Sequence, residues 1–225
     1  MSWSTDEWRA WDKRYAAEGR YLVADLDERT TSTFYPDTDR SLNPAMDAYL
    51  HGRGLDAGLA RRFGWYPGWY NGPRIIVPCV RSDTHSFWQG RLIDNLTGFK
   101  YVGEYKRWDS PKGPRHDAVC YTQVGGSTLV LVEGPFDSLA AAECGHDSIA
   151  VLGLGMSKSV VGHIASLVSG RYMARLVVPD SDAFGPWVKI QASLTNHGEA
   201  FEIRSPAPYK DLAEMPILER KLLLA

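Results

Sequence analysis

The stretch Ser127–Asp137, with the sequence STLVLVEGPFD, constrains the fold of this chain more than any other. Its apolar run, Leu129–Val132, is short and uninterrupted, which is typical of a strand buried on both faces of a parallel sheet. The run stops at Glu133, and Pro135 then opens a segment of helix-forming residues, since proline suits the first position of a helix. The sequence therefore places a carboxylate at a strand-to-helix turn, where open α/β sheets bind their ligands.

A second segment repeats this arrangement. Residues 175–179 (RLVVP) have strand composition and run directly into Asp180 and Asp182, which are followed by Gly185. Because the carboxyl ends of parallel strands lie at one edge of a sheet, we expect Glu133, Asp180 and Asp182 to converge there. Carboxylates packed together repel one another unless a cation lies between them, and Mg²⁺ takes oxygen ligands while it keeps waters for a substrate phosphate. These residues predict a site for one or two Mg²⁺ or Mn²⁺ ions.

The tail of the chain, residues 125–225, has the pattern of a βαβ series. Besides Leu129–Val132, the pattern predicts strands at 148–152, 175–179 and 200–203, and helices at 158–168 and 186–196. Strands that alternate with helices favour a parallel sheet covered by helices. We therefore expect an α/β protein whose tail is a parallel four-stranded βαβ sheet.

The middle segment, residues 41–124, has a different pattern. Helices are expected from Asn43 and after Asp56, and short β-rich runs follow at 74–78, 85–93 and 99–105, which together predict a smaller α+β subdomain. The segment holds eleven Lys and Arg residues against seven Asp and Glu residues, whereas residues 1–40 have six against nine and the tail eight against eleven. An excess of positive charge suits a surface that binds a polyanion, although a solvated face can have the same composition.

Residues 1–40 form a Trp-rich N-terminal extension. Trp8, Trp11 and Tyr15 recur at helical spacing with charged residues between them, which predicts an amphipathic helix. Two alternatives stay open for this helix: it packs on the body of the protein, or it docks on a partner protein.

Composition and missing motifs exclude several classes of protein. The chain is 44% hydrophobic, enough for a sizeable core, but it has neither an apolar stretch long enough to cross a bilayer nor the apolar core of a signal peptide. We expect a cytoplasmic protein with no membrane partner. Cys79, Cys120 and Cys144 include no CxxC pair, so we expect neither a zinc ribbon nor a disulfide framework, and we interpret each cysteine as a small buried hydrophobe.

The acidic motifs resemble the Toprim domain, the catalytic module of bacterial DnaG-type primases, of type IA and type II topoisomerases and of some nucleases. The match consists of Glu133 in VEGPFD, the Asp-x-Asp-x-x-Gly motif of residues 180–185, and Lys210-Asp211, which resembles the third acidic motif of the family. Each acid alone also fits a helix N-terminus, where its negative charge interacts favourably with the positive end of the helix dipole. The resemblance implies that Glu133, Asp180 and Asp182 are catalytic and hold the metal. It further implies two supporting acids, Asp137 and Asp211, and a phosphate contact from Lys210.

The middle segment resembles the subdomain that precedes Toprim in bacterial and phage primases. The matching stretches are Tyr49–Gly54, residues 74–78, Gly90-Arg91, Lys100-Tyr101 and Pro111–Gly113. The resemblance covers roughly residues 41–215 and favours a primase catalytic core over a topoisomerase. It implies that the template backbone or nucleotide phosphates are bound by Arg91, Lys100 and Lys112, as phosphate contacts dominate nucleic-acid affinity.

The function implied by the resemblance is DNA-dependent synthesis of RNA primers, a metal-dependent nucleotidyl transfer from nucleoside triphosphates on a single-stranded DNA template. Glu133 is expected to be a metal ligand rather than a general base, because a carboxylate close to metal has a depressed pKa. Two alternatives stay open: a Toprim-type metal-dependent nuclease, and a non-catalytic nucleic-acid-binding subunit of a replication complex.

DnaG-type primases usually carry an N-terminal zinc-binding domain and a C-terminal helicase-binding region, and the sequence shows a counterpart of neither. We therefore expect a compact, split primase of a phage or mobile element, in the host cytoplasm if a phage encodes it. Initiation would depend on a separate zinc-binding protein, on a replicative helicase, or on relaxed template choice.

Overall fold

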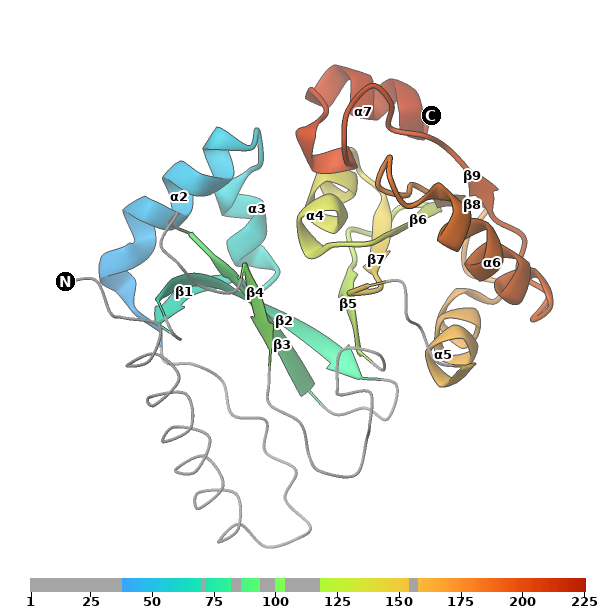
Figure 1. The fold of residues 1–225 in the computed structure, drawn as a ribbon, viewed down its shortest axis with the longest axis horizontal. Helices are drawn as coiled ribbons and strands as arrows, with labels where there is room; N and C mark the ends of the chain where they lie inside the picture. Colours follow the sequence, from blue (N-terminus) through green and yellow to red (C-terminus); the bar gives the residue numbers. More distant parts are fainter. Residues whose placement is uncertain (1–37, 70–71, 82–85, 94–99, 104–117, 154–157) are drawn as a thin grey trace, which may run out of the picture. The chain divides into compact units, whose positions relative to one another are not determined.

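A nine-stranded β-sheet runs through the part of the chain that this structure, a computed structural model, describes (Figure 1). The described residues are 38–69, 72–81, 86–93, 100–103, 118–153 and 158–225. The strands are β1 (Tyr66–Trp69), β2 (Pro73–Arg81), β3 (Ser86–Leu92), β4 (Tyr101–Gly103), β5 (Ala118–Thr122), β6 (Thr128–Val132), β7 (Asp147–Ala150), β8 (Ala174–Val177) and β9 (Glu202–Ile203). Neighbouring strands follow the order β4-β3-β2-β5-β7-β6-β8-β9, and β1 pairs with β2 outside this path.

Four of these strands, in the order β7, β6, β8 and β9, run parallel to one another. They overlap the four segments that the tail of the sequence predicts as strands. The helices that connect them are α4 (Pro135–Glu143), α5 (Lys158–Val168) and α6 (Phe184–Thr195). Parallel neighbours need such crossover connections, because a tight turn can join only antiparallel strands.

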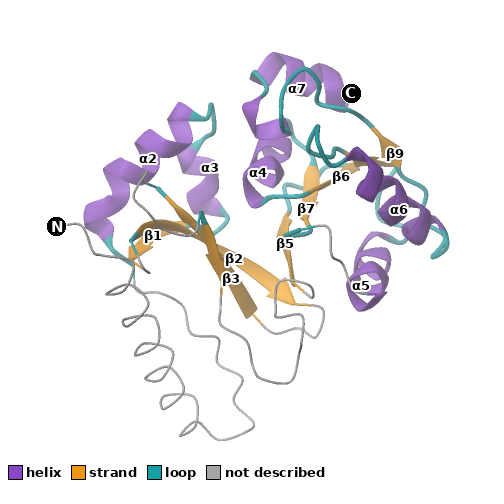
Figure 2. Ribbon diagram, viewed as in Figure 1, coloured by secondary structure: helices purple, strands orange, loops and turns teal. Residues whose placement is uncertain are grey.

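The position of β6 explains why its sequence is apolar without interruption. Leu129 and Leu131 belong to the hydrophobic core that contains α5 and α6, whereas Val130 and Val132 belong to the core on the side of α4. Successive residues of a strand point to opposite faces, so a strand with helices over both faces needs an apolar residue at every position. Figure 2 shows the helices on both sides of this half of the sheet.

The middle segment forms the antiparallel half of the sheet. In this half β2 pairs with β1 and β3, and β3 pairs with β4. The helical elements η1 (Arg40–Leu42), α2 (Asn43–Gly52) and α3 (Ala57–Arg62) precede these strands. The Asp56 side chain caps α3 by accepting hydrogen bonds from the N–H groups of Gly58 and Leu59, at 2.6 and 3.0 Å. Helices α2 and α3 and strands β2, β3 and β4 overlap the segments that the sequence predicts, whereas η1, β1 and β5 were not predicted.

Strand β5 joins the two halves, because it pairs antiparallel with both β2 and β7. All the described residues belong to one compact unit, Phe34–Ala225. The boundary expected at residue 125 therefore falls just after β5 inside one continuous sheet, and the division into residues 41–124 and 125–225 stays a prediction. Most of the N-terminal extension, including its expected helix, lies outside the described residues.

The expectation that the chain contains no disulfide is wrong. Cys79 of β2 and Cys120 of β5 form a disulfide with an S–S distance of 1.98 Å. The register that pairs Val80 with Val119 sets these two cysteines opposite each other, and both are buried. Their separation of 41 residues hid this pairing in the sequence, which does not reveal that β2 and β5 are neighbours. Cys144 is free and half-buried.

A buried carboxylate fixes the turn that leads into β6. Asp147 is 1% exposed, and its Oδ1 atom accepts hydrogen bonds of 2.8 to 3.1 Å from the N–H groups of residues 124–126. Its Oδ2 atom accepts a hydrogen bond of 2.8 Å from the hydroxyl of Tyr172. The turn also needs glycine, because a Cβ at Gly126 would lie 2.5 Å from the carbonyl oxygen of Gly145.

The chain continues beyond β9 with two elements that the sequence patterns did not predict, η3 (Leu212–Glu214) and α7 (Ile217–Leu224). Both pack on α4, and Leu212 and Leu224 are buried in the core on that side. None of the helices in the described ranges is both long and apolar enough to cross a membrane.

Candidate active site

Glu133 directly follows β6, and Asp180 and Asp182 follow β8. The two strands are parallel neighbours, and the N–H of Val178 extends their ladder by bonding the Leu131 carbonyl at 2.9 Å. Glu133 and Asp180 therefore leave adjacent strand ends at the carboxyl edge of the sheet, as the sequence predicts. Both are half-buried, and Asp182 is exposed.

The electrostatics of these acids show that they share one environment. Burial raises the pKa of Asp180 to about 6, and the charges of Asp211 and Asp182 act in the same direction, while Lys210 opposes them. Burial likewise raises the pKa of Glu133, reinforced by the charges of Asp180 and Asp182. The edge of the sheet thus collects more negative charge than the neighbouring cations neutralise.

Asp137 and Asp211 extend the acidic cluster. Asp137 lies in the first turn of α4 and is 7% exposed, and burial together with the charge of Asp211 raises its pKa to about 8. Its Oδ1 atom accepts a 3.0 Å hydrogen bond from the N–H of Ala213. Asp211 caps η3 by accepting the N–H of Glu214 at 2.9 Å. The two supporting acids of the sequence analysis therefore lie beside the strand-end acids.

The donor set suits a hard divalent cation, because it consists of carboxylate oxygens that repel one another. Within the described ranges, no three Asp, Glu, His or Cys side chains already lie close enough together to hold a metal ion. Binding would therefore need rotation of these side chains about their χ angles. Besides burial, the charges of neighbouring carboxylates contribute to the raised pKa values of Glu133 and Asp180, and a bound cation would neutralise this repulsion.

Arg91 of β3 is held against three aromatic rings. Its guanidinium carbon lies 4.7 Å from the ring centroid of Tyr101, 5.7 Å from that of Tyr49 and 5.9 Å from that of Phe136. Phe136 belongs to α4, three positions after Glu133. These contacts orient the planar cation by cation–π attraction. Tyr101 also lies near Asp137, because the charges of Arg91 and Asp137 both act on the pKa of its hydroxyl.

Arg53, at the end of α2, is a site residue that the sequence reasoning did not assign. Its guanidinium lies 5.6 Å from the Phe136 centroid, and its Nη2 atom lies 3.6 Å from Oδ2 of Asp211. Its Nε atom is buried and has no hydrogen-bond partner among the described residues. The signal was available, because Arg53 is part of the matching stretch Tyr49–Gly54.

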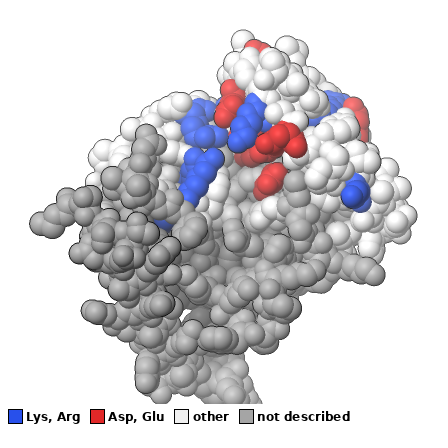
Figure 3. Space-filling model, viewed as in Figure 1, with Lys and Arg blue, Asp and Glu red and all other residues white. Residues whose placement is uncertain are grey.

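The lysines predicted to bind phosphate lie in the same neighbourhood where the structure describes them. Burial lowers the pKa of Lys100, and the charges of Arg91 and Lys210 lower it further. The carbonyl of Lys210 accepts the N–H of Ser181 at 2.7 Å, which places Lys210 beside the turn that carries Asp180 and Asp182. Figure 3 shows basic side chains directly beside acidic ones on one face. Lys112 lies outside the described residues.

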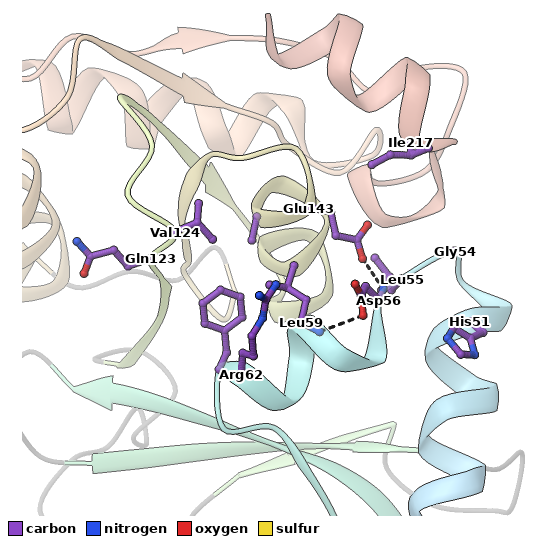
Figure 4. A pocket seen from close by; sticks show the side chains of 12 residues that line it. His51, Gly54, Leu55, Asp56, Leu59, Arg62, Gln123, Val124, Glu143 and Ile217 are labelled. Atoms are coloured by element: carbon purple, nitrogen blue, oxygen red, sulfur yellow. Dashed lines mark hydrogen bonds between the residues drawn. The ribbon is translucent and has the colours of Figure 1, made fainter.

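A cavity of about 1150 Å³ lies at the opposite end of α4 (Figure 4). It is lined by parts of α2 and α3, by Gln123 and Val124, and by Glu143 and Ile217. The acids and cations of the candidate active site do not line it. The two carboxylates that line this cavity already have structural partners: Glu143 accepts the N–H of Asp56 and pairs with Arg220, and Asp56 caps α3.

No protein-family model matches the chain, and the search of curated proteins also finds no match. Among solved structures, the chain is similar to the RNA polymerase domain of the primase DnaG from Mycobacterium tuberculosis, with a TM-score of 0.60 and 16% identity over 82% of this chain and 78% of that one. It is also similar to the Aquifex aeolicus primase fragment with zinc-binding and RNA polymerase domains, with a TM-score of 0.57 and 17% identity over 83% of this chain and 55% of the other.

A third similar chain comes from the bacteriophage T7 lagging-strand DNA polymerase in complex with the primase domains of two gp4 subunits, an RNA/DNA hybrid and dTTP. Its TM-score is 0.52, with 14% identity over 77% of this chain and 86% of that one. At such identities the likeness concerns the fold alone. The described part of the chain has the fold of a primase RNA polymerase domain.

Proposed function

We propose that this protein synthesises RNA primers on single-stranded DNA by metal-dependent nucleotidyl transfer. The observation that carries the proposal is the electrostatic coupling of Glu133, Asp180 and Asp182 at one sheet edge, within a fold similar to primase RNA polymerase domains. Structural ion pairs also perturb pKa values, but here like charges converge at the mouth of a parallel sheet, where ligands bind.

In this proposal the tail of the chain is a Toprim domain. Glu133, Asp180 and Asp182 hold one or two Mg²⁺ or Mn²⁺ ions. Bound there, the cation neutralises charge on the phosphate oxygens of the nucleotide. Asp137 and Asp211 support this cluster, the first as a buried acid and the second as the partner of Arg53.

The proposed reaction joins the 3′-oxygen of one nucleotide to the α-phosphorus of the next nucleoside triphosphate. The bond from that phosphorus to the bridging oxygen breaks, pyrophosphate leaves, and the hydroxyl proton passes to solvent. Phosphoryl transfer of this kind depends mainly on positioning and on neutralisation of charge. The side chains present at the acidic edge are suited to both tasks.

The cations opposite the acids bind the phosphates of the template and the nucleotide. Arg91 is already oriented by its three aromatic contacts, so less side-chain entropy is lost when it binds a phosphate. Arg53, Lys100 and Lys210 add positive charge to the same region. Besides burial, the charges of Lys210 and Arg53 both lower the pKa of Lys100, which supports their closeness to it. Together they make the affinity for single-stranded DNA strongly dependent on salt.

Initiation is the step for which we propose a partner. The Aquifex aeolicus structure contains a zinc-binding domain beside its RNA polymerase domain, and the T7 structure contains primase domains of gp4. We propose that this chain obtains start-site choice from a separate zinc-binding protein or from a replicative helicase.

One assay tests the proposal. The protein is incubated with Mg²⁺, single-stranded DNA and labelled ribonucleoside triphosphates, and the products are separated by size. We expect short RNA products, and we expect the variants E133Q and D180N to lower their yield by about a hundredfold or more. Glu202→Gln, which removes an exposed acid on β9, is the matched control and should leave the yield unchanged.

Two other outcomes would overturn the proposal. Shortened DNA that disappears in E133Q and D180N would make the protein a Toprim-type nuclease that uses the same acids. DNA that is retained by the protein without any RNA or cleavage product would make it a non-catalytic binding subunit. The assay is repeated with Mn²⁺ so that a preference for this ion does not hide the activity.

A further inference from the structure

Arg220 of α7 is buried, with a side chain that is 1% exposed, although it carries a positive charge. A buried guanidinium is costly unless it is paired and hydrogen-bonded. Its Nη1 atom donates a hydrogen bond of 2.6 Å to Oε2 of Glu143, and its Nε atom donates one of 2.6 Å to the carbonyl of Met215. Nothing in the proposed reaction uses this residue directly.

The remaining hydrogen bonds of Arg220 reach two distant parts of the chain. Its Nη2 atom donates to the carbonyl of Ala213 at 3.0 Å and to the carbonyl of Gly54 at 3.2 Å. Glu143 in turn accepts the N–H of Asp56 at 2.5 Å. Figure 4 marks this hydrogen bond with a dashed line. One buried ion pair therefore links α7, the η3 turn, the end of α4 and the turn between α2 and α3.

Both of these carbonyls belong to segments that carry the candidate active site. Gly54 directly follows Arg53, the basic residue that meets the acidic cluster. Ala213 donates its own N–H to Asp137 at 3.0 Å, while its carbonyl is bound by Arg220. The guanidinium of Arg220 thus binds the backbone next to Arg53, through the carbonyl of Gly54, and the backbone that contacts Asp137, through the carbonyl of Ala213.

We propose that Arg220 is a positioning residue that sets the register of Arg53 against Asp211 and Asp137. It touches no reacting group and acts through the backbone that it binds. Arginine suits this task, because its planar fork can bind a carboxylate and several carbonyls at once, whereas lysine offers a single ammonium group. The expected effect of Arg220 on the rate of primer synthesis rests on the proposed function, whereas its expected effect on the order of the bound backbone does not.

The test uses a variant that removes the ion pair without leaving a buried charge. In R220M/E143Q the methionine fills the space of the stem, and the glutamine oxygen still accepts the N–H of Asp56. The matched control is R204M/E202Q, because Arg204 also pairs with a glutamate and also binds a carbonyl of α7, that of Leu223 at 2.6 Å. In the described part of the chain, the side-chain hydrogen bonds of Arg204 go to Glu202 and Leu223 and not to Gly54 or Ala213.

The first measurement is hydrogen exchange of single amides by NMR in the full-length protein. We expect exchange at the Ala213 amide to speed up by roughly tenfold or more in R220M/E143Q, while the amides of β6 keep their protection. R204M/E202Q should leave the Ala213 amide unchanged. Unaltered protection of Ala213 in R220M/E143Q would overturn the positioning role, whether or not the protein makes primers.

The second measurement is primer synthesis at saturating nucleotide, combined with a double-mutant cycle. We expect R220M/E143Q to lower turnover by roughly tenfold in the wild-type background but by less than about twofold when Arg53 is already replaced by glutamine. Equal losses in both backgrounds would contradict an action through Arg53. A wild-type protein without primer synthesis would refute the proposed function and leave the exchange result standing.

R220K gives a second variant should the double variant fail to fold. It keeps the positive charge opposite Glu143, so the buried ion pair survives, but one ammonium group cannot bind all the carbonyls. We expect R220K to fold, with faster exchange at Ala213 than in the wild type. Exchange at the wild-type rate in R220K would count against the proposal.

Discussion

The Nη2 atom of Arg53 lies 3.6 Å from Oδ2 of Asp211, so the end of α2 meets the start of η3 at the edge of the acidic cluster. The charge of Asp211 acts on both Asp137 and Asp180, where it raises the pKa of each carboxyl. Arg53 moderates this negative field at Asp137, whereas Lys210 and Lys100 moderate it at Asp180. Arg53 is also one of the cations that act on Lys100, and so it belongs to both sides of the site.

Replacing Arg53 by glutamine should separate its role in activity from its role in stability. The Arg53–Asp211 pair is partly exposed, so its loss should change the free energy of unfolding by less than about 1 kcal/mol. Primer synthesis should fall by roughly ten- to a hundredfold, because a cation near the reacting phosphates is lost. Both quantities are measured on the same preparation, by urea unfolding and by the primer assay.

Arg61→Gln is the matched control for R53Q. Arg61 lies in the neighbouring helix α3 and forms an exposed ion pair with Asp47. Its replacement removes the same charge from the same half of the sheet at a distance from the acids. A loss of primer synthesis in R61Q as large as in R53Q would show that overall charge, rather than the position of Arg53, decides activity.

The buried carboxyl of Asp137 predicts a dependence of stability on pH. Burial, with the charge of Asp211, raises its pKa from 3.8 to about 8, so the folded state holds this proton more tightly than the unfolded state does. The free energy of unfolding should therefore fall as pH rises from about 4 to about 8 in the absence of divalent cations. D137N cannot ionise and keeps an acceptor for the Ala213 N–H, so it should be more stable than the wild type at pH 8, and this difference should be smaller at pH 5.

Urea unfolding in EDTA at several pH values measures this effect. Glu214→Gln is the control, because Glu214 is an exposed acid of the same η3 turn. The prediction is wrong if D137N and the wild type lose stability in parallel between pH 5 and pH 8. It is also wrong if the wild type gains stability over that range.

The sequence was most informative where local pattern and tertiary environment agree. The run Leu129–Val132 is apolar at each position because helices cover both faces of β6, and this pattern is legible without a structure. The acid at its end then follows from the direction of the strand. The sequence alone predicted that Glu133 and Asp180 lie close together, because parallel strands end at a common edge of a sheet. This rule depends on topology and not on the distance between residues in the sequence.

What could not be predicted depends on neighbours that local patterns do not specify. The Cys79–Cys120 disulfide needed knowledge that β2 and β5 pair, and the two strands are separated by β3 and β4 in sequence order. In the sequence, Arg220 looks like an ordinary charged residue of an amphipathic segment. Its role could not be predicted, because its four hydrogen-bond acceptors come from three separate parts of the chain. Such contacts become visible only once long-range packing is known.

A divalent cation should stabilise the folded protein if the acidic edge binds one. Mass action raises the free energy of unfolding by about 1.4 kcal/mol when free Mg²⁺ or Mn²⁺ is ten times its dissociation constant. The effect should be larger at pH 8 than at pH 5, because protons compete for Asp180, whose pKa burial raises to about 6. Thermal unfolding with increasing cation measures it without any need for catalysis.

Two variants and a control locate the cation. E133Q and D180N should each lose most of the stabilisation, because each removes a charged oxygen ligand from the site. Glu199→Gln removes an acid that is paired with Arg175, away from this edge, and should respond as the wild type does. Full stabilisation by cation in both E133Q and D180N would place the bound ion elsewhere.

The turn before β6 should depend on Asp147 more than on any contact of its own residues. D147A would leave three backbone N–H groups and the Tyr172 hydroxyl without their acceptor, and the free energy of unfolding should fall by about 3 to 5 kcal/mol. Y172F removes one of these hydrogen bonds together with the hydrogen bond between the Tyr172 and Tyr121 hydroxyls, and it should cost about 1 to 2 kcal/mol. Urea unfolding of the three proteins gives both values. Similar losses in D147A and Y172F would mean that water satisfies the N–H groups of residues 124–126, and then β6 and the acid at its end are positioned by the sheet alone.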